Sequence, residues 1–306
     1  PGCGKTSICN IIAEVLGLNK IEKTIPNLGE HIDSFARYIP VAVERGWTSK
    51  RDFIGYFNPL SKTFDRSNRR IYDALKLLDI EQKEDIAKYP FYILLDEANL
   101  SPMEYYWADF MNICDDLDSN CKINLGESSI FSIPETLHFV ATINNDHTTE
   151  TLSPRLIDRA WIITLPQVAS IMVGAKIPQE QIEIITWQSI KAAFIPESDS
   201  ALVMSPEAQK VYDSILIPHF RKARIIVSPR TDLAIKRYWI VASKRLEKDE
   251  YGNDSSIVAL DYAVAQKMLP KITGNGDNYA KWLEDLRDIC SSNNLSISAR
   301  LVKEIL

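Results

Sequence analysis

The spacing of apolar positions changes along the chain, and the change divides it into two parts. Up to about residue 166, short apolar runs alternate with stretches of helical spacing. Strands are expected at residues 38–43, 91–95, 136–142 and 161–165. Consecutive apolar residues are typical of strands buried on both faces, as in a parallel sheet between helices. The pattern therefore predicts an α/β fold for residues 1–166.

The α/β part also contains predicted helices and a predicted hairpin. Residues 7–16 and 103–116 have the apolar spacing of helices. Between the second of these and the strand at 136–142, two short β-like runs flank Gly126, which predicts an inserted hairpin over residues 121–134.

From residue 167 onward only helical spacing remains. Helices are expected at residues 182–194, 206–220, 231–246, 257–269 and 279–289. Two of them follow the pairs Ser205-Pro206 and Ser228-Pro229, and a serine before a proline is a frequent helix start. Residues 167–306 are therefore expected to form an all-helical lid domain.

Composition favours a cytoplasmic protein with a large core. The chain has 306 residues, of which 45% are hydrophobic, and no stretch is apolar enough to suggest a membrane segment. Its five cysteines lack C-x-x-C spacing, so neither disulfides nor a zinc site is expected. The net charge of −6 argues against direct neutralisation of DNA phosphates over a broad basic face. If DNA is bound, contact through a separate upstream domain or a ring pore is expected.

The first seven residues suggest a phosphate-binding loop. They match the second half of G-x-x-x-x-G-K-[ST], so the opening glycine is expected upstream of residue 1. In such a loop, backbone N–H groups turn toward the phosphates, a lysine reaches the β- and γ-phosphates, and a hydroxyl holds Mg²⁺. Lys5 and Thr6 are expected to fill the last two roles. The expected nucleotide-binding residues are Gly2, Cys3, Gly4, Lys5, Thr6 and Ser7.

Two acidic residues end the apolar run at residues 91–95. In parallel sheets, ligands bind at the carboxyl ends of the strands, where Asp96 and Glu97 are expected. Asp96 is then placed to hold Mg²⁺ together with Thr6, and Glu97 to polarise an attacking water. The two motifs together predict hydrolysis of a nucleoside triphosphate.

Polar residues farther along the chain extend this pattern. Asn144 and Asn145 follow the strand at 136–142, and Arg155 and Arg159 lie in a segment that reads LSPRLIDRA. Together with the two motifs above, these segments resemble the AAA+ NTPases. The resemblance implies that Asn144, or alternatively Asn145, is the sensor 1 residue. It also implies that Arg159 is an arginine finger acting on a neighbouring subunit, with Arg155 as the second candidate for this role.

A further arginine extends the resemblance into the lid. Arg230 opens a predicted helix after Ser228-Pro229, as the sensor 2 arginine does in AAA+ proteins. The chemistry agrees with these roles, because phosphoryl transfer spreads negative charge over oxygens that fixed cations can stabilise.

Within AAA+ proteins, the motifs are most similar to the McrB-like group. Residues 47–59 resemble its W-x-x-x-x-D-h-h-G-x-x-N-P segment, where h is apolar, and residues 96–100 resemble D-E-x-N-L. The resemblance implies a ring, as a rule a hexamer, that is usually driven by GTP, binds DNA through a separate N-terminal domain and recruits a nuclease.

The chain departs from the best-known McrB pattern at sensor 1. Residues 143–146 read INND, whereas that form carries M-N-T-A-D. The substrate is therefore left open between ATP and GTP. A MoxR-like ATPase that remodels protein complexes is the alternative function, and a ring scaffold that binds nucleotide structurally is a third. Residues 47–59 could face either a ring pore or a neighbouring subunit.

Overall fold

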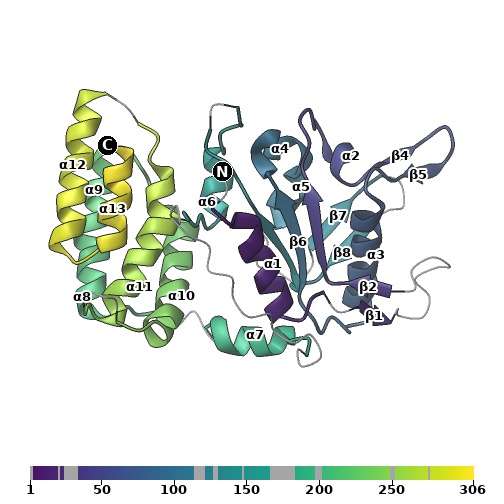
Figure 1. Ribbon diagram of the computed structural model, residues 1–306, viewed down its shortest axis with the longest axis horizontal. Helices are drawn as coiled ribbons and strands as arrows, with labels where there is room; N and C mark the ends of the chain where they lie inside the picture. The colour runs from purple at the N-terminus through teal and green to yellow at the C-terminus, as the bar shows by residue number, and fades with distance from the viewer. Residues whose placement is uncertain are drawn as a thin grey trace. The chain divides into compact units, whose positions relative to one another are not determined.

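A computed structural model gives the structure of the chain (Figure 1). It describes residues 3–19, 21–23, 34–113, 121–126, 130–146, 148–165, 183–196, 202–248, 252–274 and 276–306. The fold is mixed α/β and divides into two compact units. The first unit comprises Pro1–Leu152 and Leu165–Ile190, and the second comprises Ser153–Thr164 and Lys191–Leu306. The expected boundary lay after residue 166, but here the segment Ser153–Thr164 groups with the helical unit.

A three-stranded parallel sheet forms the centre of the first unit. Strand β6 (Phe91–Asp96) lies between β3 (Tyr38–Ala42) and β9 (Leu137–Ala141). The three strands lie within two residues of the expected bounds at each end. Because all three run in the same direction, their carboxyl ends meet at one edge of the sheet, and Asp96 ends the middle strand.

Alternating side chains of the sheet pack against different helices. Helix α1 (Lys5–Val15) lies beside β6 (Figure 1), and its buried Ala13 packs with Leu94 on one face of the sheet. On the opposite face, the ring of Phe139 contacts Phe110 at a centroid distance of 4.7 Å. Both faces of the middle strand are therefore covered, which explains its continuous apolar run.

The expected strand at residues 161–165 is wrong, because these residues form no strand. The backbone N–H of Ile162 donates to the Gln266 carbonyl (3.1 Å), and the Trp161 ring packs against Tyr238 at 4.9 Å. All of these residues except Leu165 belong to the second unit. Trp161 and Ile162 contact helices instead of a neighbouring strand, whereas Ile163 is 64% exposed, and an apolar run alone does not distinguish these cases from a strand.

Shorter elements complete the first unit. The expected helix at 103–116 is two helices, α4 (Met103–Tyr106) and α5 (Ala108–Ile113), interrupted at Trp107, and residues 114–116 lie outside the described residues. The expected hairpin is present as antiparallel strands β7 and β8. The remaining elements are β1 (Ile21–Lys23), β2 (Ser34–Ala36), α2 (Lys50–Phe53), β4 (Tyr56–Asn58), β5 (Thr63–Asp65), α3 (Arg69–Lys83), η1 (Ala98–Leu100), β7 (Cys121–Asn124), β8 (Ile130–Ile133) and the start of α7 (Trp187–Phe194).

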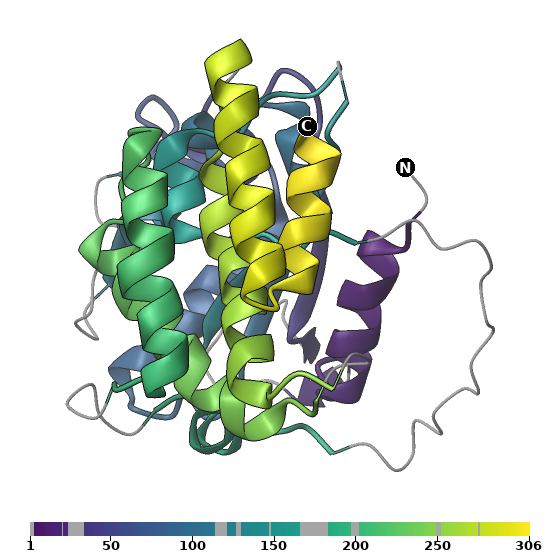
Figure 2. The ribbon, with the colours of Figure 1, turned by 90° about the vertical axis from the view of Figure 1, so that its left-hand side faces the viewer.

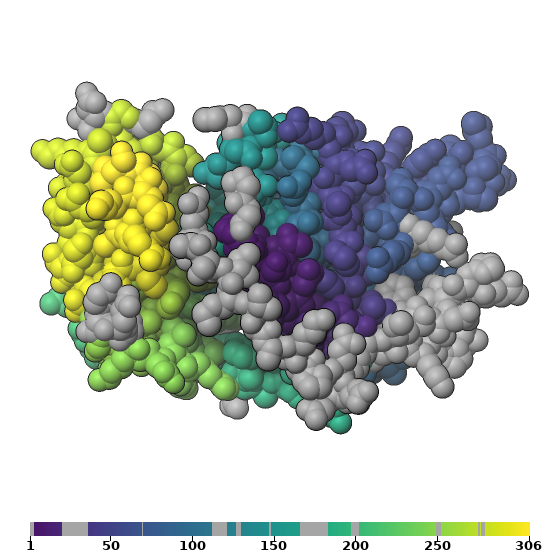
Figure 3. All heavy atoms as spheres, viewed as in Figure 1, coloured from purple at the N-terminus to yellow at the C-terminus, as the bar shows by residue number. Residues whose placement is uncertain are grey.

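The hairpin β4–β5 stands out from the surface of the first unit (Figure 3). It follows α2, which begins with a capping box in which Ser49 and Asp52 bond each other's backbone N–H groups. Leu60 at the hairpin tip is 94% exposed. Residues 47–59 thus contain a short helix and the first strand of a projecting hairpin.

Helices make up the second unit, and several of them lie side by side (Figure 2). The long helices are α10 (Pro229–Arg245), α11 (Ser255–Ala263), α12 (Asp277–Ser292) and α13 (Ser296–Ile305). The shorter ones are α6 (Pro154–Arg159), α8 (Pro206–Gln209), η4 (Lys210–Leu216), α9 (Ile217–Lys222), η5 (Val264–Met268) and η6 (Leu269–Lys271), of which η4 and η5 are π-helical. Helix α13 was not expected from the sequence.

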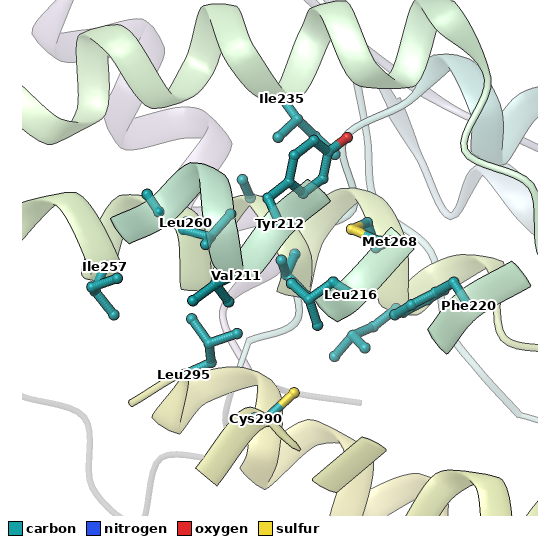
Figure 4. Packing of buried hydrophobic residues seen from close by; sticks show 14 of the residues in the cluster. Val211, Tyr212, Leu216, Phe220, Ile235, Ile257, Leu260, Met268, Cys290 and Leu295 are labelled. Carbon is teal, nitrogen blue, oxygen red and sulfur yellow. The ribbon is translucent and has the colours of Figure 1, made fainter. Parts of the chain in front are cut away.

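A single apolar cluster holds these helices together. Tyr212 and Leu216 from η4, Ile235 from α10, Met268 from η5 and Leu295 before α13 are buried in it (Figure 4). Because these residues come from four separate segments of the second unit, that unit has its own core. No helix among the described residues has both the length and the apolar character needed to cross a membrane.

Candidate nucleotide-binding site

The predicted phosphate-binding loop leads into helix α1. Gly4 is the residue before the helix and has a φ of 79°, a left-handed conformation that glycine adopts without strain. Lys5, Thr6 and Ser7 form the first turn, where unpaired N–H groups favour an anion. Cys3 is half-buried before them, and Pro1 and Gly2 lie outside the described residues.

Lys5 is joined to the two predicted residues that would act on the attacking water. Its Nζ donates to Asn144 Oδ1 at 2.7 Å, and Asn144 Nδ2 donates to Glu97 Oε1 at 3.4 Å. The three side chains come from positions far apart in the sequence, yet they form one connected chain of contacts. Asn145, the alternative sensor residue, is exposed next to them.

Thr6 and Asp96 form a second contact at the same edge of the sheet. The Thr6 hydroxyl donates to Asp96 Oδ1 at 2.9 Å. A hydroxyl and a carboxylate side by side are oxygen ligands of the kind that Mg²⁺ takes from a protein when nucleotide phosphates and water supply the rest. These two residues therefore fit the predicted metal-binding role. Among the described residues, no group of three or more histidines, cysteines and acids could hold a metal ion.

Thr142 supports both acids, although no role for it was predicted from the sequence. Its hydroxyl donates to Asp96 Oδ1 at 2.6 Å and accepts from the backbone N–H of Glu97 at 2.9 Å. The Thr142 carbonyl also accepts from Ala98 N–H at 2.8 Å. Thr142 directly follows β9, so the neighbouring strand aligns the end of β6. The T-x-N spacing of Thr142 and Asn144 was the available sequence signal.

Glu97 adopts a left-handed backbone conformation, with φ 54° and ψ 44°. This conformation is costly for a residue with a Cβ, by about 1 kcal/mol or more, and it persists where the surroundings fix it. Here the bonds that Thr142 makes to Glu97 N–H and Ala98 N–H fix the backbone. The turn ends the strand and directs the chain so that the Glu97 carboxylate contacts Asn144.

Asn99 fixes the backbone of Asn144. Its Nδ2 donates to the carbonyls of Asn144 (2.7 Å) and Glu150 (3.0 Å), and its Oδ1 accepts from Asn144 N–H at 3.1 Å. Asn99 is buried, so water does not compete for these hydrogen bonds. They therefore hold the backbone at Asn144 and Glu150 firmly. Asn99, which lies in the D-E-x-N-L segment, thus supports the candidate site.

Two groups near the loop remain uncharged at neutral pH. Burial, together with the charge of Asp96, raises the pKa of the Cys9 thiol. Burial, with smaller contributions from Cys9 and Asp96, raises the pKa of Tyr38 to about 12, and its hydroxyl donates to Asn10 Oδ1 at 2.7 Å. A neutral thiol is a weak nucleophile, so Cys9 is unsuited to covalent catalysis. The chemistry of this edge therefore depends on its lysine, carboxylates and amide.

The three predicted arginines all belong to the second unit, whereas the loop, Asp96, Glu97 and Asn144 belong to the first. Arg155 and Arg159 lie on α6, where Arg159 Nη1 donates to the Arg155 carbonyl at 2.9 Å. Arg230 is in the first turn of α10 and pairs with Asp158 at 3.6 Å. The three arginines therefore lie in one unit and the predicted phosphate-binding residues in the other.

Comparison with known proteins bears on the second unit. Residues 198–306 match a family described as a domain of unknown function, DUF8727. No curated protein and no solved structure matches the chain. The match covers the helical unit from before α8 to the end of α13 and assigns no activity to it.

Proposed function

We propose that the chain is a P-loop nucleoside triphosphatase of the AAA+ type. The observation that carries this proposal is the connected set of side chains at the carboxyl edge of the sheet. Lys5, Asn144 and Glu97 form one chain of contacts, and Thr6 bonds Asp96. A structural loop needs no acid held in a strained turn beside a lysine and an amide. Hydrolysis of a phosphoanhydride requires such groups.

Each group has a role that follows from its position. Lys5 and the N–H groups at the start of α1 bind the phosphates of ATP or GTP. Thr6 and Asp96 would hold Mg²⁺, which neutralises charge on the phosphate oxygens. Glu97 accepts the proton of the attacking water, and Asn144 orients that water. Because Asn144 contacts both Lys5 and Glu97, it lies between the group that binds the γ-phosphate and the base.

The arginines would complete the charge stabilisation. We infer that Arg159, with Arg155 as the second candidate, acts on the site of a neighbouring subunit, and that Arg230 acts from the lid. Fixed cations aimed at the γ-phosphate lower the barrier because the transition state carries charge on its oxygens. This assignment implies a homo-oligomer, and we propose a hexameric ring in the cytoplasm.

At the level of biological role, we propose a motor subunit of a McrBC-like restriction or defence system that acts with a nuclease. The support is the set of McrB-like segments, including the inserted hairpin, whose strands β7 and β8 precede β9 of the parallel sheet. DNA would be contacted through a domain upstream of residue 1 or through the ring pore. Remodelling of protein complexes, as in MoxR-like ATPases, is the competing role.

Turnover with ATP and GTP, measured side by side with and without DNA, tests the proposal. We expect hydrolysis of at least one nucleotide, abolished in Lys5→Ala and retained in Lys83→Ala, whose lysine pairs with Asp79 on α3. Stimulation by DNA would favour the motor of a defence system. A hydrolysis rate that is the same with and without DNA would favour remodelling of protein complexes. Failure to hydrolyse either nucleotide would contradict the proposed activity itself.

A further inference from the structure

The Asp158 carboxylate contacts several polar side chains in the second unit. It lies on α6 between the two predicted finger arginines, Arg155 and Arg159. Its carboxylate accepts from the hydroxyls of Ser228 (2.9 Å) and Thr231 (2.9 Å), which lie at the start of α10. The side chain therefore joins α6 to the helix that carries Arg230.

Positive charges surround the same carboxylate. Lys271 Nζ forms an ion pair with Asp158 Oδ1 and also donates to Thr231 Oγ1 at 2.9 Å. Arg230 Nη1 lies 3.6 Å from Asp158 Oδ2. Asp158 and Lys271 are 22% and 12% exposed, so water screens their attraction less than at the surface.

A buried lysine holds the carboxyl end of α6. Lys267 is only 2% exposed, and its Nζ donates to the carbonyls of Asp158 (3.0 Å) and Ala160 (2.8 Å). The last carbonyls of a helix lack intrahelical partners, and a cation there is stabilising. Two lysines from η5 and η6 thus hold α6, one through the backbone and one through the side chain of Asp158.

The charge of Asp158 persists over the whole neutral and mildly acidic range. Burial alone would raise the pKa of this carboxyl. The hydrogen bonds from Lys271, Thr231 and Ser228 outweigh that effect and lower the pKa to about 2. Protonation of Asp158 therefore does not break these contacts at neutral or mildly acidic pH.

We propose that Asp158 is a positioning residue for hydrolysis, because it locks the arginine-bearing helix α6 onto the start of α10. Arg155 and Arg159 are then presented as a rigid group together with Arg230, carried by the helical unit. The inference rests on the proposed nucleotide hydrolysis and adds to it how the arginines are held. A helix of only six residues has little intrinsic stability, so its orientation depends on such tertiary contacts.

Asp158→Asn tests this role, with Asp232→Asn as the matched control. Asp232 also lies on α10 and also pairs with a lysine, Lys236 at 2.8 Å, but it is not bonded to α6. We expect kcat to fall about tenfold in Asp158→Asn, with KM for the nucleotide within about twofold of the wild type. The control is expected to keep wild-type kcat. Lys271→Gln removes the other partner of the same ion pair and is expected to lower kcat to a similar extent. It serves as the test variant if Asp158→Asn folds poorly.

A double-mutant cycle separates positioning from a general effect on folding. In a chain that carries Arg155→Ala, Arg159→Ala and Arg230→Ala, adding Asp158→Asn is expected to change kcat by less than about twofold, because the positioned groups are gone. A further tenfold loss in that background would overturn the inference, as would wild-type kcat in both Asp158→Asn and Lys271→Gln. If the wild-type chain hydrolyses no nucleotide, the proposed function fails and the inference fails with it.

Discussion

At the scale of single residues, the candidate site depends on how two polar side chains order the ends of adjacent strands. Thr142 forms hydrogen bonds with the Asp96 carboxylate and the backbone N–H of Glu97. Asn99 forms hydrogen bonds with both the backbone N–H and the carbonyl of Asn144. Thr142 and Asn99 are both buried. Buried polar groups of this kind are fully bonded in native proteins, and removing one leaves its partners unsatisfied.

Asn144 and Asn145 offer a direct comparison at this scale. Asn144 contacts Lys5 and Glu97, whereas Asn145 is exposed. We therefore expect Asn144→Ala to lower kcat for nucleotide hydrolysis by about 10- to 100-fold, because the water loses an orienting group. Asn145→Ala should stay within about twofold of the wild type. The reverse order of effects, measured by phosphate release at saturating nucleotide, would transfer the sensor role to Asn145.

At the scale of elements, the local pattern of apolar residues predicted the strands of the parallel sheet. It failed at an apolar run that contacts helices instead of a strand. Strands β3, β6 and β9 were predicted because each contains a run of apolar residues of the kind that parallel strands have. The apolar run at 161–165 was misread as a strand because it packs on helices of the second unit. The helix at 103–116 was predicted without the break at Trp107, since apolar spacing continues across the interruption.

Side-chain contacts within the site could be predicted only in part. The positions of Lys5, Thr6, Asp96 and Glu97 follow from motif spacing, because strands that run in parallel place their ends together. The supporting role of Thr142 and the junction at Asp158 depend on pairings across 46 and 113 positions of sequence, to Asp96 and Lys271. Spacing carries no signal for the pairing of Asp158 with Lys271, and for Thr142 the T-x-N spacing to Asn144 marks the residue but not its partner. The last helix, α13, is held by Asp261, which accepts from the backbone N–H groups of Ile297 and Ser298.

The turn into the β4–β5 hairpin gives a prediction about stability. Gly55 has a φ of 132°, and a Cβ there would lie 2.2 Å from the Asp65 carbonyl oxygen of the paired strand. Gly46 also has a positive φ, 90°, but nothing lies within 4 Å of its Cβ position. We expect Gly55→Ala to lower the free energy of unfolding by about 3 kcal/mol or more, and Gly46→Ala by about 1 kcal/mol. Denaturant unfolding measures both, and equal losses would contradict the steric argument.

At the scale of the whole molecule, the candidate functional residues are divided between two units. The first holds the phosphate loop, the acids and Asn144, and the second holds the arginines, with Asp158 joining α6 to α10. Each unit has buried apolar residues of its own. The candidate phosphate-binding residues and the candidate arginines thus belong to different units.

Hydrolysis by Glu97→Gln, with nucleotide binding measured on the same protein, tests the central claim most directly. The substitution keeps the size of the side chain and removes the base, so we expect normal nucleotide affinity and a loss of turnover of at least about 100-fold. Glu44→Gln, an exposed position in the same unit, should behave as the wild type. Wild-type turnover in Glu97→Gln would contradict the assigned mechanism.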